Sequence, residues 1–180
     1  MRLSDITKHS LKARVLYLDL ISLMAQVDGS LDKVELEHLH FLLQSFQVPE
    51  KYHARIVAKS EYQPEQISSA FEDLKQRKLH YSFFLDLMVM AMADGVLQEE
   101  EKRFLAQIRN LIQIPAVDFH NLLNFAQTTG SLDLNSVIDP MYSYVIDGFF
   151  SWARQSQVKL YLQTAFALNP KVDAYLKANL

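Results

Sequence analysis

Apolar residues recur along this chain at intervals of three and four positions, with polar residues between them. The first such stretch places Leu16, Leu20, Leu23, Met24 and Val27 on one face of an α-helix. Further stretches with this spacing begin at Leu36, Ile67, Phe84, Phe104, Phe119, Met141, Val158 and Val172. No stretch shows the sustained alternation of a half-buried strand. The pattern predicts an all-α fold, a compact helical bundle of about nine or ten helices.

Prolines mark the predicted helix starts. Each of the five, Pro49, Pro64, Pro115, Pro140 and Pro170, stands just before an apolar pattern of helical period. Proline is favoured as the first residue of a helix because an N–H at that position would have no partner within the helix. The last two prolines each follow an Asp or Asn that can cap the helix with its side chain, so two independent signals mark those starts.

The chain also matches itself when it is shifted by 66 residues. Tyr17–Ile56 overlays Phe83–Leu122, and we call these segments the first and second copy. Nine residues of the first copy recur unchanged in the second: Met24, Ala25, Asp28, Gly29, Leu31, Glu35, Leu39, Gln47 and Pro49. A repeated helix, Asp-Gly turn, helix, proline and helix indicates a duplicated unit. Because two copies are too few for an open solenoid, we expect them to pack face to face around a pseudo-twofold axis.

We predict a single domain over residues 1–180, with a duplicated core over 12–128 and C-terminal helices over 130–180 packed on it. Eight of the twenty aromatic residues lie in the last 41 positions. On the helix that begins there, the predicted buried stripe carries Met141, Tyr144, Val145, Gly148, Phe149 and Trp152. Tyr142 and Phe150 fall off this stripe. They are candidates for a surface that binds a protein partner or forms a homo-oligomer, since aromatic residues are enriched at interface hot spots.

The repeated motif reads Asp-Gly, one residue, Leu, three residues, Glu. In one interpretation it is purely structural: Gly29 and Gly95 end one helix with a left-handed residue, and Asp32 and Glu35 form a capping box that begins the next. Leu31 and its counterpart 66 residues later would pack inward. Capping leaves Asp28 and Asp94 unexplained, because the helix dipole disfavours an anion at a helix C-terminus.

In the other interpretation the turns bind a divalent cation, calcium or magnesium. Each turn brings an aspartate back towards a glutamate, Asp28 towards Glu35 and Asp94 towards Glu101. Carboxylate oxygens are the usual ligands of hard cations. A complete EF-hand is excluded because its first ligand positions would fall on the apolar helix that precedes each turn. The structural turn and the weak cation site both remain open.

A two-copy helical chain that carries Ala25-Gln26-Val27-Asp28-Gly29 and Ala91-Met92-Ala93-Asp94-Gly95, each followed by Leu and Glu, resembles the TerB-like family. The family is named for tellurite resistance and includes the membrane-proximal domain of a DnaJ-like co-chaperone. The resemblance implies a compact all-α bundle. It also implies an acidic surface that binds divalent cations in a membrane-associated stress complex. Carried over to this chain, the implied residues are Asp28, Glu35, Asp94 and Glu101.

Composition excludes several classes of function. The chain has no cysteine, which rules out disulfides, cysteine-ligated zinc and thiol catalysis. Its net charge of -3 argues against nucleic-acid binding. Its longest apolar stretch, 83–93, contains Asp86 and is too short to span a membrane, and no signal-peptide core precedes it. Motifs for a nucleophilic serine or a phosphate-binding loop are missing. We therefore expect a cytoplasmic protein that is not an enzyme.

One histidine of the first copy has the spacing of a metal ligand. Glu35 and His38 have the Glu-x-x-His spacing of di-iron helix bundles, but the second copy has Phe104 in place of the histidine. A di-iron site needs both halves. We therefore expect His38 to be exposed and His40 to lie half-buried at the edge of the core.

Overall fold

The computed structural model describes residues 6–26, 29, 31–58, 62–92, 97, 99–131, 140–158, 174, 175 and 178. These residues contain eight α-helices, two 3-10 helices and no strand, so the predicted all-α fold is confirmed. In chain order the elements are η1 (Ile6–Lys8), α1 (Leu11–Ala25), α2 (Lys33–Ser45), η2 (Glu50–Tyr52), α3 (His53–Val57), α4 (Pro64–Gln76), α5 (His80–Ala91), α6 (Glu99–Ile112), α7 (Ala116–Ser131) and α8 (Pro140–Gln155). The last two predicted helices, from Val158 and Val172, lie almost entirely outside the described residues.

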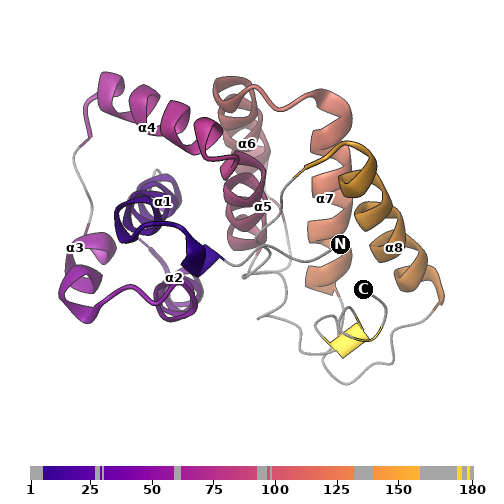
Figure 1. Cartoon of the computed structure of the whole chain (residues 1–180), viewed down its shortest axis with the longest axis horizontal. Helices are drawn as coiled ribbons and strands as arrows, with labels where there is room; N and C mark the ends of the chain where they lie inside the picture. The colour runs from indigo at the N-terminus through magenta and orange to yellow at the C-terminus, as the bar shows by residue number, and fades with distance from the viewer. Residues whose placement is uncertain are drawn as a thin grey trace.

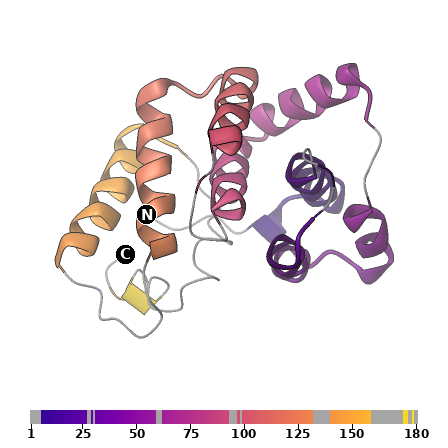
Figure 2. The same cartoon turned by 180° about the vertical axis from the view of Figure 1, so that it is seen from behind.

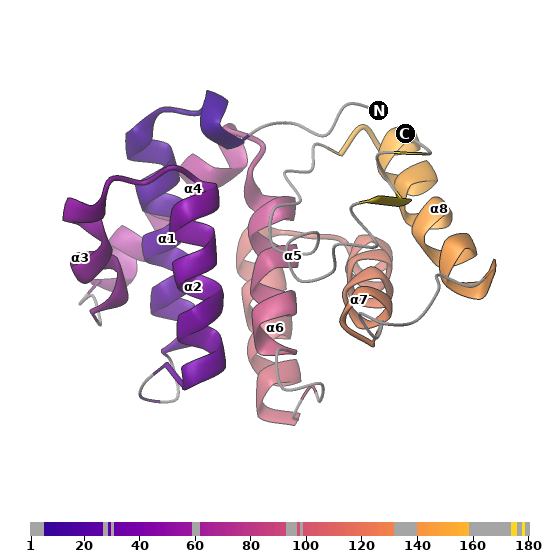
Figure 3. The same ribbon diagram turned by 90° about the horizontal axis from the view of Figure 1, so that it is seen from below.

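Helices α1 and α5 pack against each other, and we call them the central helices; Figure 1 shows α5 near the middle of the molecule and α1 among α2, α3 and α4. Helices α2, α3 and α4 lie against α1, whereas α6 and α7 lie against α5 and α8 covers the outer side of α7 (Figure 2). Both central helices are buried on nearly every side, as expected for helices that are apolar all round. Helix α4 crosses from α1 to α6 and so joins the two halves, which Figure 3 shows side by side. None of the described helices is long and apolar enough to cross a membrane.

Positions 66 residues apart have matching local structure. Helices α2 and α6 begin 66 positions apart, and so do η2 and α7. Gln47 and Gln113, also 66 apart, both have a left-handed backbone, with φ of 50° and 61°. In each case the next residue donates its N–H across the helix end, Val48 to the Leu43 carbonyl and Ile114 to the Arg109 carbonyl, both at 3.0 Å. This is the Schellman pattern that satisfies carbonyls at the end of a helix.

The copies differ in the length of the helix beyond this end. In the first copy the short element η2 is followed directly by α3, which has five residues. In the second copy α7 begins 66 positions after the start of η2 and has sixteen residues. The longer helix is the one that packs against α8, where Phe125 stacks on Phe149 with ring centroids 4.0 Å apart. Apolar packing against α8 thus extends α7 beyond the repeated unit.

Most of the prolines stand where the helix starts were expected. Pro64 and Pro140 are the first residues of α4 and α8. Pro49 and Pro115 each stand one residue before η2 or α7, so neither is the first residue of its element, contrary to the expectation. Pro170 lies outside the described residues.

The predicted buried stripe of α8 is correct for Phe149, which is buried, and for Trp152, which packs against the core, but wrong for Met141 and Tyr144. The helix buries Ile146, Phe149, Phe150 and Ala153, while Tyr144 is 81% exposed and Met141 65% exposed. These buried residues are also spaced three and four positions apart, so two faces of α8 carry apolar residues at helical spacing. The contact with α7 determines which of the two faces is buried. The expectation that Phe150 and Tyr142 lie on a partner surface is also wrong, since Phe150 is in the core and Tyr142 packs against it.

The two histidines of α2 are reversed relative to expectation. His38 is half-buried, and burial lowers the pKa of its imidazole, although the nearby charges of Asp32 and Glu37 act in the opposite direction. His40 is exposed. Helix α2 packs on α1 through Leu39, Leu42 and Leu43, and the side of the helix that holds His38 is turned towards this contact.

Candidate functional site

The first acidic turn is described in part. Gly29 has a positive φ of 140°, but α1 ends at Ala25 with Gln26 as its C-cap, so the prediction that Gly29 ends this helix as a left-handed residue is wrong. Asp32 accepts a hydrogen bond from the Glu35 N–H at 2.8 Å, and Glu35 accepts one from the Asp32 N–H at 2.9 Å. The predicted capping box is therefore confirmed. Leu31 packs against the core, as expected, and Asp28 lies outside the described residues.

The second acidic turn is described mainly beyond its glycine. Asp94 and Gly95 lie outside the described residues, whereas Leu97 packs against the core as predicted. Glu101 is the third residue of α6 and is half-buried, and Glu99 in the same turn forms an ion pair with Lys102 at 2.6 Å. In the described part of the chain no three His, Asp or Glu residues are grouped closely enough to hold a metal. With both aspartates outside it, the cation site stays a prediction.

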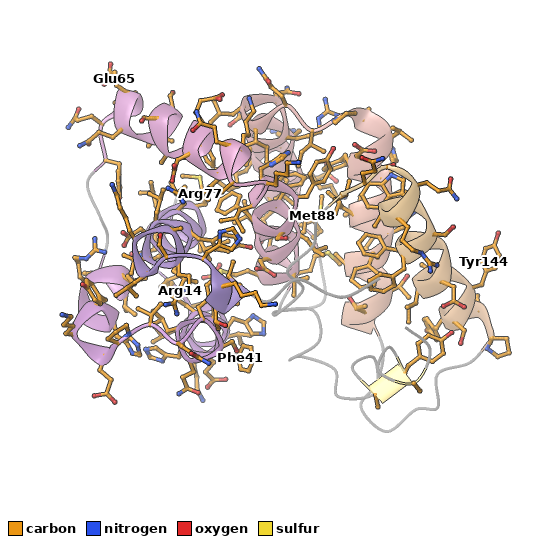
Figure 4. The ribbon with its side chains drawn as sticks, viewed as in Figure 1. Arg14, Phe41, Glu65, Arg77, Met88 and Tyr144 are labelled. Atoms are coloured by element: carbon orange, nitrogen blue, oxygen red, sulfur yellow. The ribbon has the colours of Figure 1, made fainter. Side chains whose placement is uncertain are left out.

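A pocket that the sequence did not predict lies between α1 and η2. This α1–η2 pocket has a volume of about 360 Å³ and is lined by Leu11, Lys12, Val15, Leu16, Asp19 and Tyr52. A second cavity of about 500 Å³, which we call the α4 groove, shares Lys12 and Leu16 with it and continues along α4 to Glu65 and Asp73. Figure 4 shows Glu65 at the outer end of α4. The pocket has the mostly apolar walls and few polar groups that are typical of binding sites.

Asp19 is the acidic residue among those that line this pocket. It is only 4% exposed, and its Oδ2 accepts hydrogen bonds from Arg55 Nη2 at 2.9 Å and from the Tyr62 hydroxyl at 3.3 Å. Its Oδ1 is buried and has no hydrogen-bond partner among the described residues. Burial raises the pKa of the Asp19 carboxyl, against the opposing hydrogen bond and charge of Arg55. Such a carboxylate retains capacity to accept a hydrogen bond, and leaving that capacity unused costs stability.

A second polar cluster joins α5, α7 and α8. The Tyr81 hydroxyl donates to Asp118 Oδ2 at 2.5 Å, and the indole Nε1 of Trp152 donates to Asp118 Oδ1 at 3.1 Å. Both carboxylate oxygens of this buried aspartate are thus hydrogen-bonded. Burial raises the pKa of the Tyr81 hydroxyl, and Asp118 raises it further. We call these three residues the indole site.

A third buried carboxylate links the two central helices. The Tyr17 hydroxyl on α1 donates to Asp86 Oδ2 on α5 at 2.6 Å, and both side chains are almost completely buried. Burial raises the pKa of Tyr17 well above its usual value, and the charge of Asp86 acts in the same direction. This bond ties the first copy to the second.

Sequence reasoning missed Asp19 and did not assign a role to Asp86. The available signal was a charged residue on the apolar face of a predicted helix: Asp19 stands three residues after Leu16 and four before Leu23. An aspartate is rarely buried unless it is paired, so its presence there indicates a partner from another element.

The comparison with protein families now supplies an identity at the level of the family. A family model described as Tellurite resistance protein TerB matches residues 15–124, which is more than half of the chain and includes both Asp-Gly turns. Neither the curated proteins nor the solved structures give a match. The matched region falls within the 12–128 core predicted from the repeat. The chain therefore belongs to the TerB family.

Proposed function

We propose that this TerB-family chain is a cytoplasmic, non-enzymatic scaffold protein of a stress response. It binds a divalent cation, calcium or magnesium, at its two acidic turns. Asp28 and Glu35 form one site, and Asp94 and Glu101 form the other. The supporting observation is that Glu35 and Glu101 are each the third residue of a helix, α2 and α6, and that these helices begin 66 positions apart. Equivalent carboxylates thus follow both Asp-Gly pairs.

Capping and cation binding are compatible at Glu35. An ionised carboxylate has two oxygens with about four lone-pair directions, and the capping box uses one of them. An aspartate that follows a helix C-terminus is disfavoured by the helix dipole, and a bound cation removes this penalty. The cation therefore gives a reason for Asp28 and Asp94 that the capping box alone does not.

A thermal titration tests the proposal. Calcium or magnesium at a hundredfold excess over its dissociation constant should stabilise the folded state by about 2.7 kcal/mol for each occupied site. For a chain of this length the melting temperature should rise by roughly 5–10 °C for each site. The double variant Asp28→Asn, Asp94→Asn should lose this rise. A charge-matched control, Glu50→Gln with Glu65→Gln, removes two exposed carboxylates elsewhere and should keep it. Equal rises in all three proteins, or none in the unmodified chain, would overturn the proposal.

A second candidate function is protein–protein interaction without a metal, with the Asp-Gly turns serving only the fold. The observation that favours it is Tyr144, which is 81% exposed and projects from the outer side of α8 (Figure 4). Light scattering at increasing protein concentration measures self-association directly. Tyr144→Ser should weaken any dimer, whereas Val117→Ser, at a 66% exposed position on α7, should leave it unchanged. A monomer at every concentration would exclude a homo-oligomer through this surface.

A further inference from the structure

Helix α8 has a second face, opposite the one that packs on α7, and this face contains apolar side chains. Met141, Tyr144, Gly148 and Gln155 are exposed along it, with the half-buried Ser151 between the last two. Met141 is 65% exposed and Tyr144 is 81% exposed, and Figure 4 shows Tyr144 projecting from the outer side of the molecule. We call these five residues the outer stripe of α8.

The outer stripe has the spacing of a coiled-coil seam. Its residues are separated by three, four, three and four positions, so the pattern repeats every seven residues, as the core positions of a coiled coil do. The other face of α8 is already packed, since it buries Ile146, Phe149, Phe150 and Ala153. Helix α8 thus has one face for the core of the chain and a second face suited to another helix.

Gly148 stands in the middle of the outer stripe. It is exposed and lies well inside a helix of 16 residues, where glycine is less stable than alanine. A Cβ added at this position would meet no atom within 4 Å, so packing within the described part of the chain does not require a glycine. A residue without a side chain does allow the backbone of another helix to approach closely.

The charges beside the stripe indicate which helix fits. Asp147 and Arg154 are both exposed and lie seven positions apart, on the same flank of the stripe. The Tyr175 hydroxyl donates to Asp147 Oδ2 at 3.0 Å, and a carboxylate with one such bond keeps further lone pairs for a cation. A twofold axis between two antiparallel helices turns each flank to face the same flank of its neighbour. Opposite charges on one flank are therefore complementary to a second α8.

A single register brings these charges together. When Gly148 lies opposite Ser151 of a second molecule, Asp147 comes beside Arg154 of that molecule, because both pairs follow from the same seven-residue repeat. The twofold symmetry then forms the ion pair twice. The two smallest residues of the outer stripe meet at the centre, where the helices approach most closely.

The opposite flank is complementary in the same register. It carries Val145 and Trp152, both half-buried, and the antiparallel arrangement places Val145 of one molecule beside Trp152 of the other. In a parallel pair each charged flank would instead face this apolar flank, which leaves the charges without partners. The distribution of charged and apolar residues thus selects the antiparallel orientation.

We propose that the outer stripe of α8 binds the same stripe of a second molecule of this chain, antiparallel, in a twofold-symmetric homodimer closed by two ion pairs between Asp147 and Arg154. This inference rests on the second candidate function, protein interaction through α8, and adds the partner and its orientation. It uses none of the four residues of the acidic turns. Because one pair of 16-residue helices, each about 24 Å long, makes a small interface, we expect a dissociation constant in the micromolar range.

Charge reversal tests the pairing by light scattering on the full chain. The unmodified chain should become dimeric as its concentration rises from the micromolar to the millimolar range. Asp147→Arg and Arg154→Asp each bring like charges together twice, so each should weaken the dimer at least tenfold. An equal mixture of the two variants should dimerise again, because every arginine then meets an aspartate. The double reversal in one chain should restore the dimer for the same reason.

Gly148→Gln tests the close approach of the two helices. A longer side chain at the centre of the outer stripe holds the helices apart and should weaken the dimer at least tenfold. The same substitution puts a better helix former into open space, so the melting temperature of the diluted, monomeric chain should rise by roughly 1–3 °C. A misfolded variant would instead lower the melting temperature.

Tyr175→Phe is the matched control. It removes the hydrogen bond that Asp147 accepts within its own chain and should leave the dimer unchanged, which separates the charge effect of Asp147→Arg from the loss of that bond. Thermal melts establish that each variant is folded. Should a charge variant fail to fold, Gly148→Gln still decides the question, and a dimer of unchanged strength in that variant would contradict the proposed contact.

The outcomes separate this inference from the function on which it rests. A chain that stays monomeric at every concentration would overturn both the antiparallel dimer and self-association through α8. A dimer that persists in both charge variants, or that their mixture does not restore, would overturn the antiparallel pairing while self-association itself would stand.

Discussion

Removing the hydroxyl of Tyr17 tests whether the hydrogen bond between the central helices holds the two copies together. Tyr17→Phe deletes the donor that lies 2.6 Å from Asp86 Oδ2 and keeps the ring contacts with Phe46 and Phe83 at 5.1 and 5.6 Å. The substitution is compatible with the packing of this unit because the residue 66 positions later is already phenylalanine and is equally buried.

The magnitude follows from the burial of both partners. Hydrogen bonds to charged groups contribute about 1.5–3 kcal/mol, and a buried carboxylate that loses a donor also bears a desolvation penalty. We therefore expect Tyr17→Phe to lower the free energy of unfolding by about 2–3 kcal/mol. For a chain of this size that corresponds to a fall in melting temperature of roughly 5–10 °C.

The same bond gives a pH dependence whose sign is fixed. Because the pKa of Tyr17 is raised in the folded state above the ordinary value of 10.0, the contribution of its neutral hydroxyl is complete below pH 10. It is lost as the pH rises above that value, since unfolding then releases a proton. The difference in stability between the unmodified chain and Tyr17→Phe should be constant from pH 6 to 9 and should shrink above pH 10.

Urea unfolding followed by circular dichroism measures these differences. Tyr144→Phe removes a hydroxyl at a position that is 81% exposed and should change the free energy of unfolding by less than about 0.5 kcal/mol. A second variant, Tyr17→Phe with Asp86→Leu, removes both polar partners, and its loss should be smaller than the sum of the single losses. A loss below about 0.5 kcal/mol for Tyr17→Phe, or additive losses in the double variant, would refute the reasoning.

Three further substitutions test local features of the fold by the same unfolding measurement. Asp32→Ala removes the capping box with Glu35 and should cost about 1 kcal/mol, while Asp32→Asn should cost less because asparagine also caps; equal losses would contradict the cap. Trp152→Phe removes the hydrogen bond to Asp118 and should lower the free energy of unfolding by about 1–3 kcal/mol. A decrease of less than about 0.5 kcal/mol would contradict this prediction. Gln47→Gly relieves a left-handed residue and should stabilise the chain by up to about 1 kcal/mol, and a destabilised variant would count against strain there.

Local signals in the sequence predicted the helices well. The apolar period, the prolines and the polar caps each act within a few residues, so the starts of α4 and α8 at Pro64 and Pro140 could be read from the chain. The capping box of Asp32 and Glu35 is also a local pattern, and it formed as expected. The equivalence of Gln47 and Gln113 was visible as an identity, although their left-handed backbone was not.

Long-range contacts decided what the sequence could not. The buried face of α8 depends on where α7 lies, because two faces of that helix carry apolar residues at helical spacing. Asp19 accepts hydrogen bonds from Arg55 and Tyr62, which are 36 and 43 residues away in the sequence. No local pattern indicates such a pairing. The acidic turns are the opposite case, since their motif is local and their aspartates lie outside the described residues.

The buried carboxylates distinguish the two copies more sharply than their apolar residues do. Leu39 and Leu105 are the same residue and are both fully buried, whereas Asp19, Asp86 and Asp118 have no acidic counterpart 66 positions away. A buried charge is costly, so each one persists only where a specific neighbour meets it: Arg55 for Asp19, Tyr17 for Asp86, Trp152 for Asp118. Asp118 accepts a hydrogen bond on each of its two carboxylate oxygens, and Asp86 joins the two halves of the core through Tyr17. Asp19 is the least satisfied of the three, because its buried Oδ1 has no hydrogen-bond partner among the described residues and its Oδ2 depends on Arg55 and Tyr62.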